Sequence, residues 1–104
     1  MKIGMTLPVM EPGLTRQDLE AWTKQIDSGP WSHIALGERV LFSNPEFIST
    51  LSAVAAWTTR VEIIATISVL TMHDPVLSAQ QHISDSCKVN KFLFFGHCKS
   101  LKWA

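Results

Sequence analysis

Three side chains that could do chemistry follow apolar segments of this sequence. Glu38 and Arg39 come after the short apolar run 33–36, and His73 comes after the longer run 61–70. A carboxylate and a guanidinium side by side can orient an anionic group through charge-assisted hydrogen bonds. Histidine exchanges protons near neutral pH, which Glu38 would do only if its pKa were strongly raised. A surface salt bridge and a solvated loop histidine are the alternatives without function, and they stay open.

The run 61–70 is the element that must position these groups. Its residues are mostly β-branched or aliphatic on both alternating faces, which is typical of a parallel strand buried on both sides. Asp74 and Pro75 then provide an N-cap and a proline at the first helical position. A buried parallel strand that leads into a polar loop and a helix is how α/β proteins present side chains to a ligand.

Strand and helix signals alternate through the first 81 residues. They predict strands near 2–7, 34–37 and 61–69, and helices near 16–27, near 45–58 and from 75 onward. Thr15 with Asp18 predicts a capping box, and Asn44 before Pro45 predicts a second cap. The alternation predicts an α/β fold with parallel strands in the order one-two-three and the helices near 16–27 and 45–58 on one face.

The composition changes after residue 81. Residues 1–81 carry five Lys/Arg against eight Asp/Glu, whereas residues 82–104 carry four Lys against one Asp. The second segment also holds three of the five phenylalanines and both cysteines. We expect it to be a separate tail that extends the third helix briefly or lies over the open sheet, without a fourth parallel strand. A frameshift or a gene-model error would produce such a segment.

A zinc site in this tail is not expected. Its candidate ligands are His82, Cys87, His97 and Cys98. The adjacent His97 and Cys98 cannot easily both reach one tetrahedral ion, and the sequence has no C-x-x-C pair.

Bulk properties exclude several partners. The formal net charge is zero, which argues against a nucleic-acid partner. No window approaches eighteen uninterrupted apolar residues, so no membrane span is expected. Two cysteines without export features indicate reduced thiols, and we expect a cytoplasmic location.

Residues 1–81 resemble the N-terminal third of the luciferase-like flavin-dependent monooxygenases, a family that includes deazaflavin-dependent oxidoreductases. The resemblance lies in the opening KIGMTLP, in GERV after the second strand, in the NPE helix start and in VEIIATISVLTMHDPVLSAQQ. It implies an eight-stranded β/α (TIM) barrel of more than about 200 residues, with the flavin at the C-terminal ends of the strands. We therefore expect the first three β-α units of such a barrel, covering residues 1–81.

The resemblance also implies a site. Ala65, Thr66, Ile67 and Ser68 align with the place where the family's third strand bulges, often through a non-proline cis peptide, beneath the flavin ring. Small side chains let backbone approach a planar ring, although a plain buried strand is the alternative. Glu38 and Arg39 would be the catalytic pair. Thr6 and His73 would face the substrate.

The resemblance implies reduced FMN or deazaflavin as the cofactor. It implies oxygen insertion or hydride transfer on a small organic substrate, a flavin reductase as partner, and homo-oligomers among full-length relatives. The family's glycine-rich fourth strand is absent, so we expect this chain to be truncated and inactive alone. The alternatives are a non-catalytic barrel remnant and a small ligand-binding or association module. A complete doubly wound domain is disfavoured because no glycine-rich loop follows the first strand.

Overall fold

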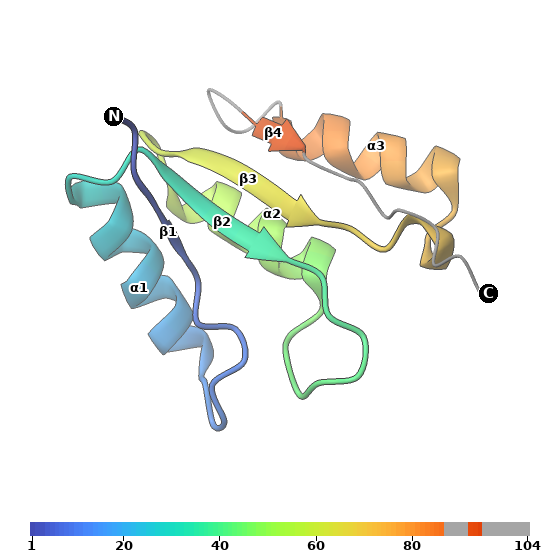
Figure 1. Cartoon of the computed structure of the whole chain (residues 1–104), viewed down its shortest axis with the longest axis horizontal. Coiled ribbons are helices and arrows are strands. Elements are labelled where there is room, and N and C mark those ends of the chain that lie inside the picture. Colours follow the sequence, from blue (N-terminus) through green and yellow to red (C-terminus); the bar gives the residue numbers. More distant parts are fainter. Residues whose placement is uncertain (87–91, 95–104) are drawn as a thin grey trace.

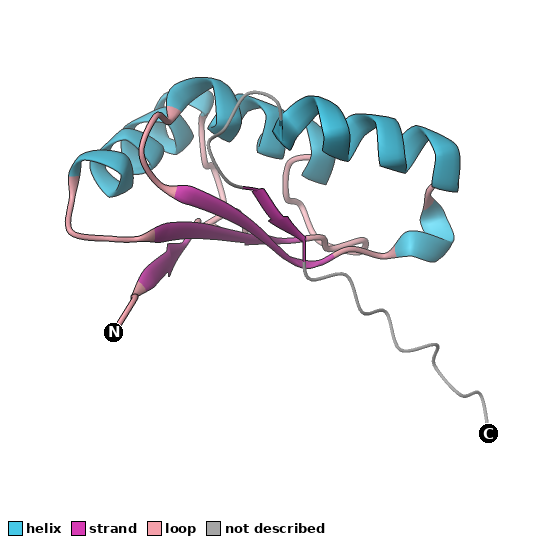
Figure 2. Cartoon of the chain, turned by 90° about the horizontal axis from the view of Figure 1, so that it is seen from above, coloured by secondary structure: helices cyan, strands magenta, loops and turns pink. Residues whose placement is uncertain are grey.

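The computed structural model describes residues 1–86 and 92–94, which form one parallel sheet covered by helices. The elements are β1 (Gly4–Thr6), α1 (Arg16–Ser28), β2 (His33–Gly37), α2 (Phe47–Trp57), β3 (Glu62–Ile67), a 3-10 turn η1 (Leu70–Met72), α3 (Pro75–Ser86) and β4 (Phe92–Phe94). The strand order is β1-β2-β3-β4 (Figure 1). Figure 2 shows the helices on one side of this sheet, so the predicted parallel order and layering are confirmed.

The prediction that no fourth parallel strand would follow was wrong. Strand β4 pairs in parallel with β3, from Ile63 opposite Phe92 to Ala65 opposite Phe94. The physical reason is that a short aromatic and aliphatic run favours the extended conformation, and the free edge of β3 offers it unpaired backbone groups. The predicted extension of the third helix is confirmed, because α3 reaches Ser86. Cys87, His97 and Cys98 lie outside the described residues.

The caps of α1 and α3 are as predicted. The Thr15 hydroxyl accepts a hydrogen bond from the Asp18 amide at 3.2 Å, and the Asp18 carboxylate accepts one from the Thr15 amide at 2.9 Å. The Asp74 carboxylate accepts from the amides of Val76 and Leu77, each at 2.9 Å. Within the described residues no helix is long and apolar enough to cross a membrane.

The cap of α2 differs from the prediction by two residues. Glu46, and not Asn44, precedes the helix and accepts hydrogen bonds from the amides of Ile48 and Ser49 at 3.0 and 2.7 Å. Asn44 instead donates its side-chain amide to the carbonyl oxygens of Arg39 and Pro45. From position 46 the glutamate side chain reaches two amides of the first turn of α2. Asn44, on the far side of Pro45, does not bond to these amides.

The hydrophobic core lies between the sheet and the helices. Side chains alternate along each strand, so Ile34, Leu36, Ile63 and Ala65 face the helices and are buried. They pack with buried residues of the helices and loops, chiefly Leu19, Ile26, Phe47, Leu51 and Val54. The other face carries Ala35, Gly37, Ile64 and Thr66, which are half-buried or exposed. Within residues 1–86 and 92–94, no helix lies over that face (Figure 2).

Asp27 ties the end of α1 to the start of β3, a contact that the sequence analysis did not identify. Its carboxylate accepts hydrogen bonds from the amides of Thr59, Arg60 and Val61 at 2.9–3.0 Å. In return, the Arg60 guanidinium donates to the carbonyl oxygens of Asp27 and Gly29, each at 2.8 Å. Burial raises the pKa of Asp27, but the bonds from Val61, Arg60 and Thr59 outweigh it and leave the pKa below its usual range.

We expect Asp27→Ala to lower the free energy of unfolding at pH 7 by about 2–3 kcal/mol, because three amides lose a charged acceptor. Since the folded pKa is lowered, this contribution is present above the unfolded pKa of about 3.9 and is lost as pH falls through the folded value. Urea unfolding of both proteins between pH 7 and pH 3 measures it. A difference between them that did not shrink at low pH would contradict the assignment.

Candidate functional site

Strand β3 contains an irregularity where β2 ends. Leu36 lies opposite Ala65 and Gly37 opposite Ile67, so Thr66 is an extra residue on β3. The Thr66 hydroxyl donates to the Leu36 carbonyl oxygen at 3.2 Å and so holds the bulged strand to its neighbour. The predicted bulge is therefore present, whereas all peptide bonds among the described residues are trans. The cis peptide that the resemblance suggested is not found.

The four residues expected at a flavin ring divide into two pairs. Thr66 and Ile67 are exposed, while Ala65 and Ser68 are buried. The Ala65 side chain belongs to the hydrophobic core, so only its backbone can approach a ligand. The Ser68 hydroxyl donates to Glu38 at 3.4 Å. Alternation along the strand turns the Ala65 side chain inward and the Ser68 hydroxyl is engaged, so the assignment of these two residues to the flavin ring stays a prediction that concerns their backbone.

Glu38 and His73 form the polar centre of this end of the sheet. His73 Nε2 lies 2.6 Å from Glu38 Oε1, and the two side chains are 21% and 9% exposed. The other carboxylate oxygen, Oε2, accepts the Val69 amide at 2.6 Å. Glu38 therefore joins the loop after β2 to the loop after β3 and fixes the orientation of the imidazole. A carboxylate that orients a histidine is an arrangement suited to proton transfer.

Among the described residues Glu38 is bonded to His73 and forms no ion pair with Arg39, and the catalytic role of Glu38 and Arg39 stays a prediction. Arg39 is exposed, and its contact here is through its backbone oxygen, which accepts from Asn44 at 3.3 Å. The partner of Glu38 is His73, 35 residues further along the chain. The available signal was topological, since both residues follow the C-terminal ends of neighbouring parallel strands, and those ends share one edge of the sheet.

A second carboxylate lies within electrostatic range of this pair. Burial raises the pKa of Glu46, but hydrogen bonds from Ser49 and Ile48 outweigh it, and the charge of His73 lowers the pKa further. The N-terminus of α2 also favours the ionised carboxylate. His73 therefore lies in the field of Glu38 and Glu46 together.

The remaining candidate, Thr6, lies at the C-terminal end of β1 and is exposed. It pairs with Ala35 of β2. Strand β2 thus separates it from β3 and the bulge, and within the described residues no hydrogen bond joins Thr6 to Glu38 or His73.

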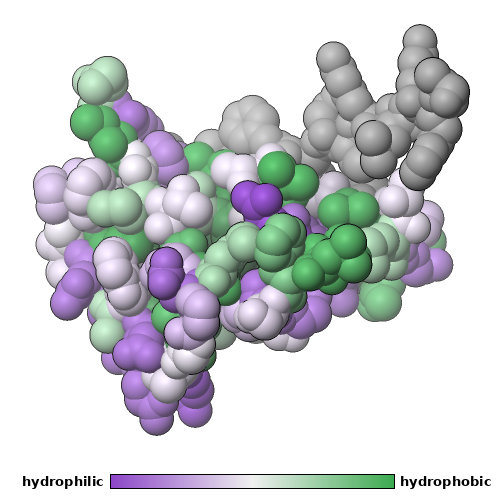
Figure 3. All heavy atoms as spheres, turned by 60° about the horizontal axis from the view of Figure 1, so that its bottom comes forward, coloured by the Kyte–Doolittle hydropathy of each residue, from purple (hydrophilic) through white to green (hydrophobic). Residues whose placement is uncertain are grey.

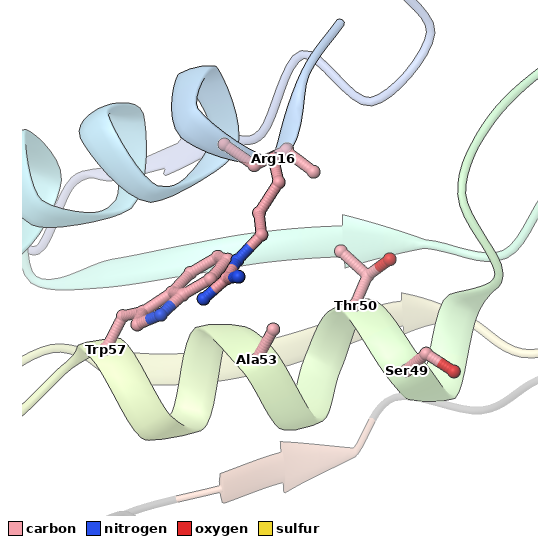
Figure 4. Close-up of a pocket in the computed structure, with 6 residues that line it drawn as sticks. Arg16, Ser49, Thr50, Ala53 and Trp57 are labelled. Carbon is pink, nitrogen blue, oxygen red and sulfur yellow. The ribbon is translucent and has the colours of Figure 1, made fainter.

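A hollow elsewhere on the molecule does not coincide with these residues. It has a volume of about 200 Å³ and lies between α1 and α2, lined by Arg16, Leu19, Ser49, Thr50, Ala53 and Trp57. Figure 4 shows the Arg16 side chain extending toward the Trp57 ring. The hollow is on the helix side of the sheet. In residues 1–86 and 92–94 no cluster of histidine, cysteine and carboxylate side chains could hold a metal ion.

Comparison with known proteins gives a family and a fold. The profile of the luciferase-like monooxygenases matches residues 1–84. One similar solved structure, from Pseudomonas putida, is a type II Baeyer-Villiger monooxygenase, the oxygenating constituent of 3,6-diketocamphane monooxygenase, in complex with FMN. Its TM-score is 0.78 at 17% sequence identity, and the match covers 96% of this chain but 30% of that one. The search of curated proteins found no match.

Proposed function

Because the chain belongs to the luciferase-like monooxygenase family, we propose that it supplies the ring-facing part of a flavin site in a β/α-barrel oxidoreductase. The observation that carries the proposal is the Glu38–His73 pair beside the bulge at Thr66, at the C-terminal ends of β2 and β3. Ligands bind at this end of the strands in β/α barrels. The FMN in the solved neighbour supports FMN over deazaflavin as the cofactor.

The residues present fit one face of a planar ring. A Cβ added at Gly37 would lie 3.2 Å from the Thr66 hydroxyl oxygen, so the missing side chain lets Thr66 approach the end of β2 closely. Ala35 and Thr66 are the small neighbours on the same uncovered face of the sheet. The planar isoalloxazine ring of a flavin could lie flat against such a surface of backbone and small side chains. When bound, reduced flavin would supply the electrons for oxygen insertion into a small organic substrate.

Within that site, we assign His73 to holding or moving a proton near the substrate. Glu38 is a positioning residue, because it acts through the imidazole that it orients. Arg39 and Thr6 are assigned to the substrate side, where an exposed cation and a hydroxyl can meet polar groups. A flavin reductase that delivers reduced flavin is the partner that this chemistry requires.

The 104-residue chain by itself is proposed to be inactive. A phosphate-bearing cofactor needs donors around its tail, and in β/α barrels these come largely from loops after the late strands. The chain spans about a third of the solved neighbour's length. No described element covers that face of the sheet, which would leave a bound ring in contact with water, and water destroys reactive intermediates of such reactions.

We therefore expect no saturable complex between the isolated chain and FMN at micromolar concentrations. Equilibrium dialysis of the purified chain against FMN, and separately against the deazaflavin cofactor, measures this. Weak binding of FMN, with a dissociation constant above about 1 mM, is consistent with contacts to the ring alone. A micromolar complex would show that the chain is a functional unit. Tighter binding of the deazaflavin than of FMN would change the cofactor assignment to deazaflavin.

A non-catalytic association module is the second candidate, favoured by the sheet face that none of the described helices covers (Figure 2). Exposed sheet surface and edges promote association between chains. Sedimentation equilibrium would favour this candidate if the chain self-associated and FMN left the association unchanged.

A further inference from the structure

The hollow between α1 and α2 is a second place in which this chain could hold a small molecule. Its volume is about 200 Å³, and none of its lining residues belongs to the proposed flavin site. An apolar cavity of about 150 Å³ is large enough to hold benzene. The hollow therefore has room for one six-membered ring with a small substituent, and the three fused rings of a flavin exceed it.

Most of the lining is apolar. Leu19 of α1 is buried, and Ala53 and Trp57 of α2 are half-buried. The Trp57 indole is the largest flat surface of the lining, and aromatic faces pack well against a second ring. Figure 4 shows the Arg16 side chain extending toward this indole from the start of α1. A ring packed on the indole would therefore have the Arg16 guanidinium within reach.

The other polar residues of the lining already have partners. The Thr50 hydroxyl donates to the Glu46 carbonyl oxygen at 2.7 Å, and Ser49 bonds the Glu46 carboxylate. In contrast, no hydrogen bond or ion pair engages the Arg16 side chain within residues 1–86 and 92–94. The lining thus offers a ligand one free polar group, and that group is a cation.

The carboxylates near Arg16 do not neutralise it. Glu20, one helical turn later on α1, forms its ion pair with Lys24. The pKa of Glu20 is lowered chiefly by the hydrogen bond from Lys24, and the charge of Arg16 makes the smallest contribution. Asp18 and Glu46 accept hydrogen bonds at the N-termini of α1 and α2. The guanidinium therefore remains available to an anion from solution.

We propose that the hollow binds a monocarboxylate with a single ring, which packs on the Trp57 indole while its carboxylate accepts hydrogen bonds from the Arg16 guanidinium. The planar guanidinium matches a carboxylate through two parallel hydrogen bonds, which are among the strongest in proteins. The apolar walls and the small volume select the ring. This inference goes beyond the flavin proposal and does not depend on it.

Three probes of the same size separate charge from shape: benzoate is an anion, benzamide is neutral and benzamidine is a cation. Titration of the ¹⁵N-labelled 104-residue chain follows the indole N–H of Trp57 and the amide of Ala53. We expect saturable shifts with benzoate and a dissociation constant of about 1 mM. Benzamide should bind at least about tenfold more weakly, because it lacks the charge that pairs with the guanidinium. Benzamidine should bind more weakly still.

Three variants test the roles of the lining residues. Arg16→Gln removes the charge of an exposed side chain and should weaken benzoate binding by at least about tenfold, to the level of benzamide. Lys24→Gln removes a cation of α1 that does not line the hollow and should leave the affinity unchanged. Ala53→Leu should abolish the benzoate shifts at Trp57, because the larger side chain fills the space for the ring.

Other binding modes give different results. Figure 3 shows hydrophobic residues gathered where β2 and β3 end, and Leu41 and Phe42 are exposed there. Benzoate shifts confined to residues 41 and 42, equal affinity for benzamide, or equal loss in the Lys24 variant would each overturn the proposal. An affinity for benzoate that fell as the protein concentration rose would show that a second copy of the chain occupies the hollow, and would overturn it as well.

Discussion

Replacing Glu38 by alanine is expected to lower the free energy of unfolding by about 2–4 kcal/mol, because three hydrogen-bonding groups lose a nearly buried acceptor. The Val69 amide, the Ser68 hydroxyl and His73 all bond this carboxylate. For a domain of this size, the midpoint of thermal unfolding should fall by more than about 8 °C. Calorimetry and urea unfolding measure the two quantities.

Two neighbouring variants control this experiment. Glu38→Gln keeps an oxygen for the Val69 amide and a donor for His73, so we expect a smaller loss, of about 1 kcal/mol. Arg39→Ala removes an exposed side chain and should change stability by less than about 0.5 kcal/mol. If Glu38→Ala cost no more than Arg39→Ala, the carboxylate would not be the link between the two loops.

Replacing Thr66 by tryptophan is expected to abolish the weak interaction of the chain with FMN. The indole would extend from the exposed bulge and fill the space in which the ring is proposed to lie. Thr66 is exposed, so the fold should tolerate the larger side chain. Amide chemical shifts measured during FMN addition report the loss directly, without relying on flavin fluorescence, which tryptophan quenches.

Thr66→Ser is the matched control, because its hydroxyl can still donate to the Leu36 carbonyl oxygen as the threonine does. We expect this variant to keep the FMN-induced shifts. If the tryptophan variant kept them as well, the bulge would not face the ring.

The layered fold was predictable because its signals are local. Each signal indicates a helix or a strand within a few residues: the caps at Thr15 and Asp74, and the apolar runs 34–37 and 61–69. Strand β4 was missed because the composition change after residue 81 hid a short strand-forming run. Its pairing with β3 depends on a free sheet edge, which only the assembled fold reveals.

The position of the candidate site in the fold could be predicted from the sequence, but the bonded partners within it could not. The topology put Glu38 and His73 at one edge of the sheet, yet adjacency in the chain suggested Arg39 as the partner of Glu38. The direction of a side chain that follows a strand depends on the loop conformation. Neither the periodicity of the apolar residues nor the spacing of residues in the sequence determines that conformation. The Asp27 link to residues 59–61 was missed for the same reason, since it joins segments more than thirty residues apart.

The most direct test of the flavin assignment is a titration of the ¹⁵N-labelled chain with FMN, followed through its amide resonances. The proposed site predicts shifts confined to Gly37 and residues 66–69, with no saturation below about 1 mM. Shifts that left those residues unchanged and mapped instead to the hollow between α1 and α2, around Arg16 and Trp57, would contradict a flavin site at the ends of β2 and β3.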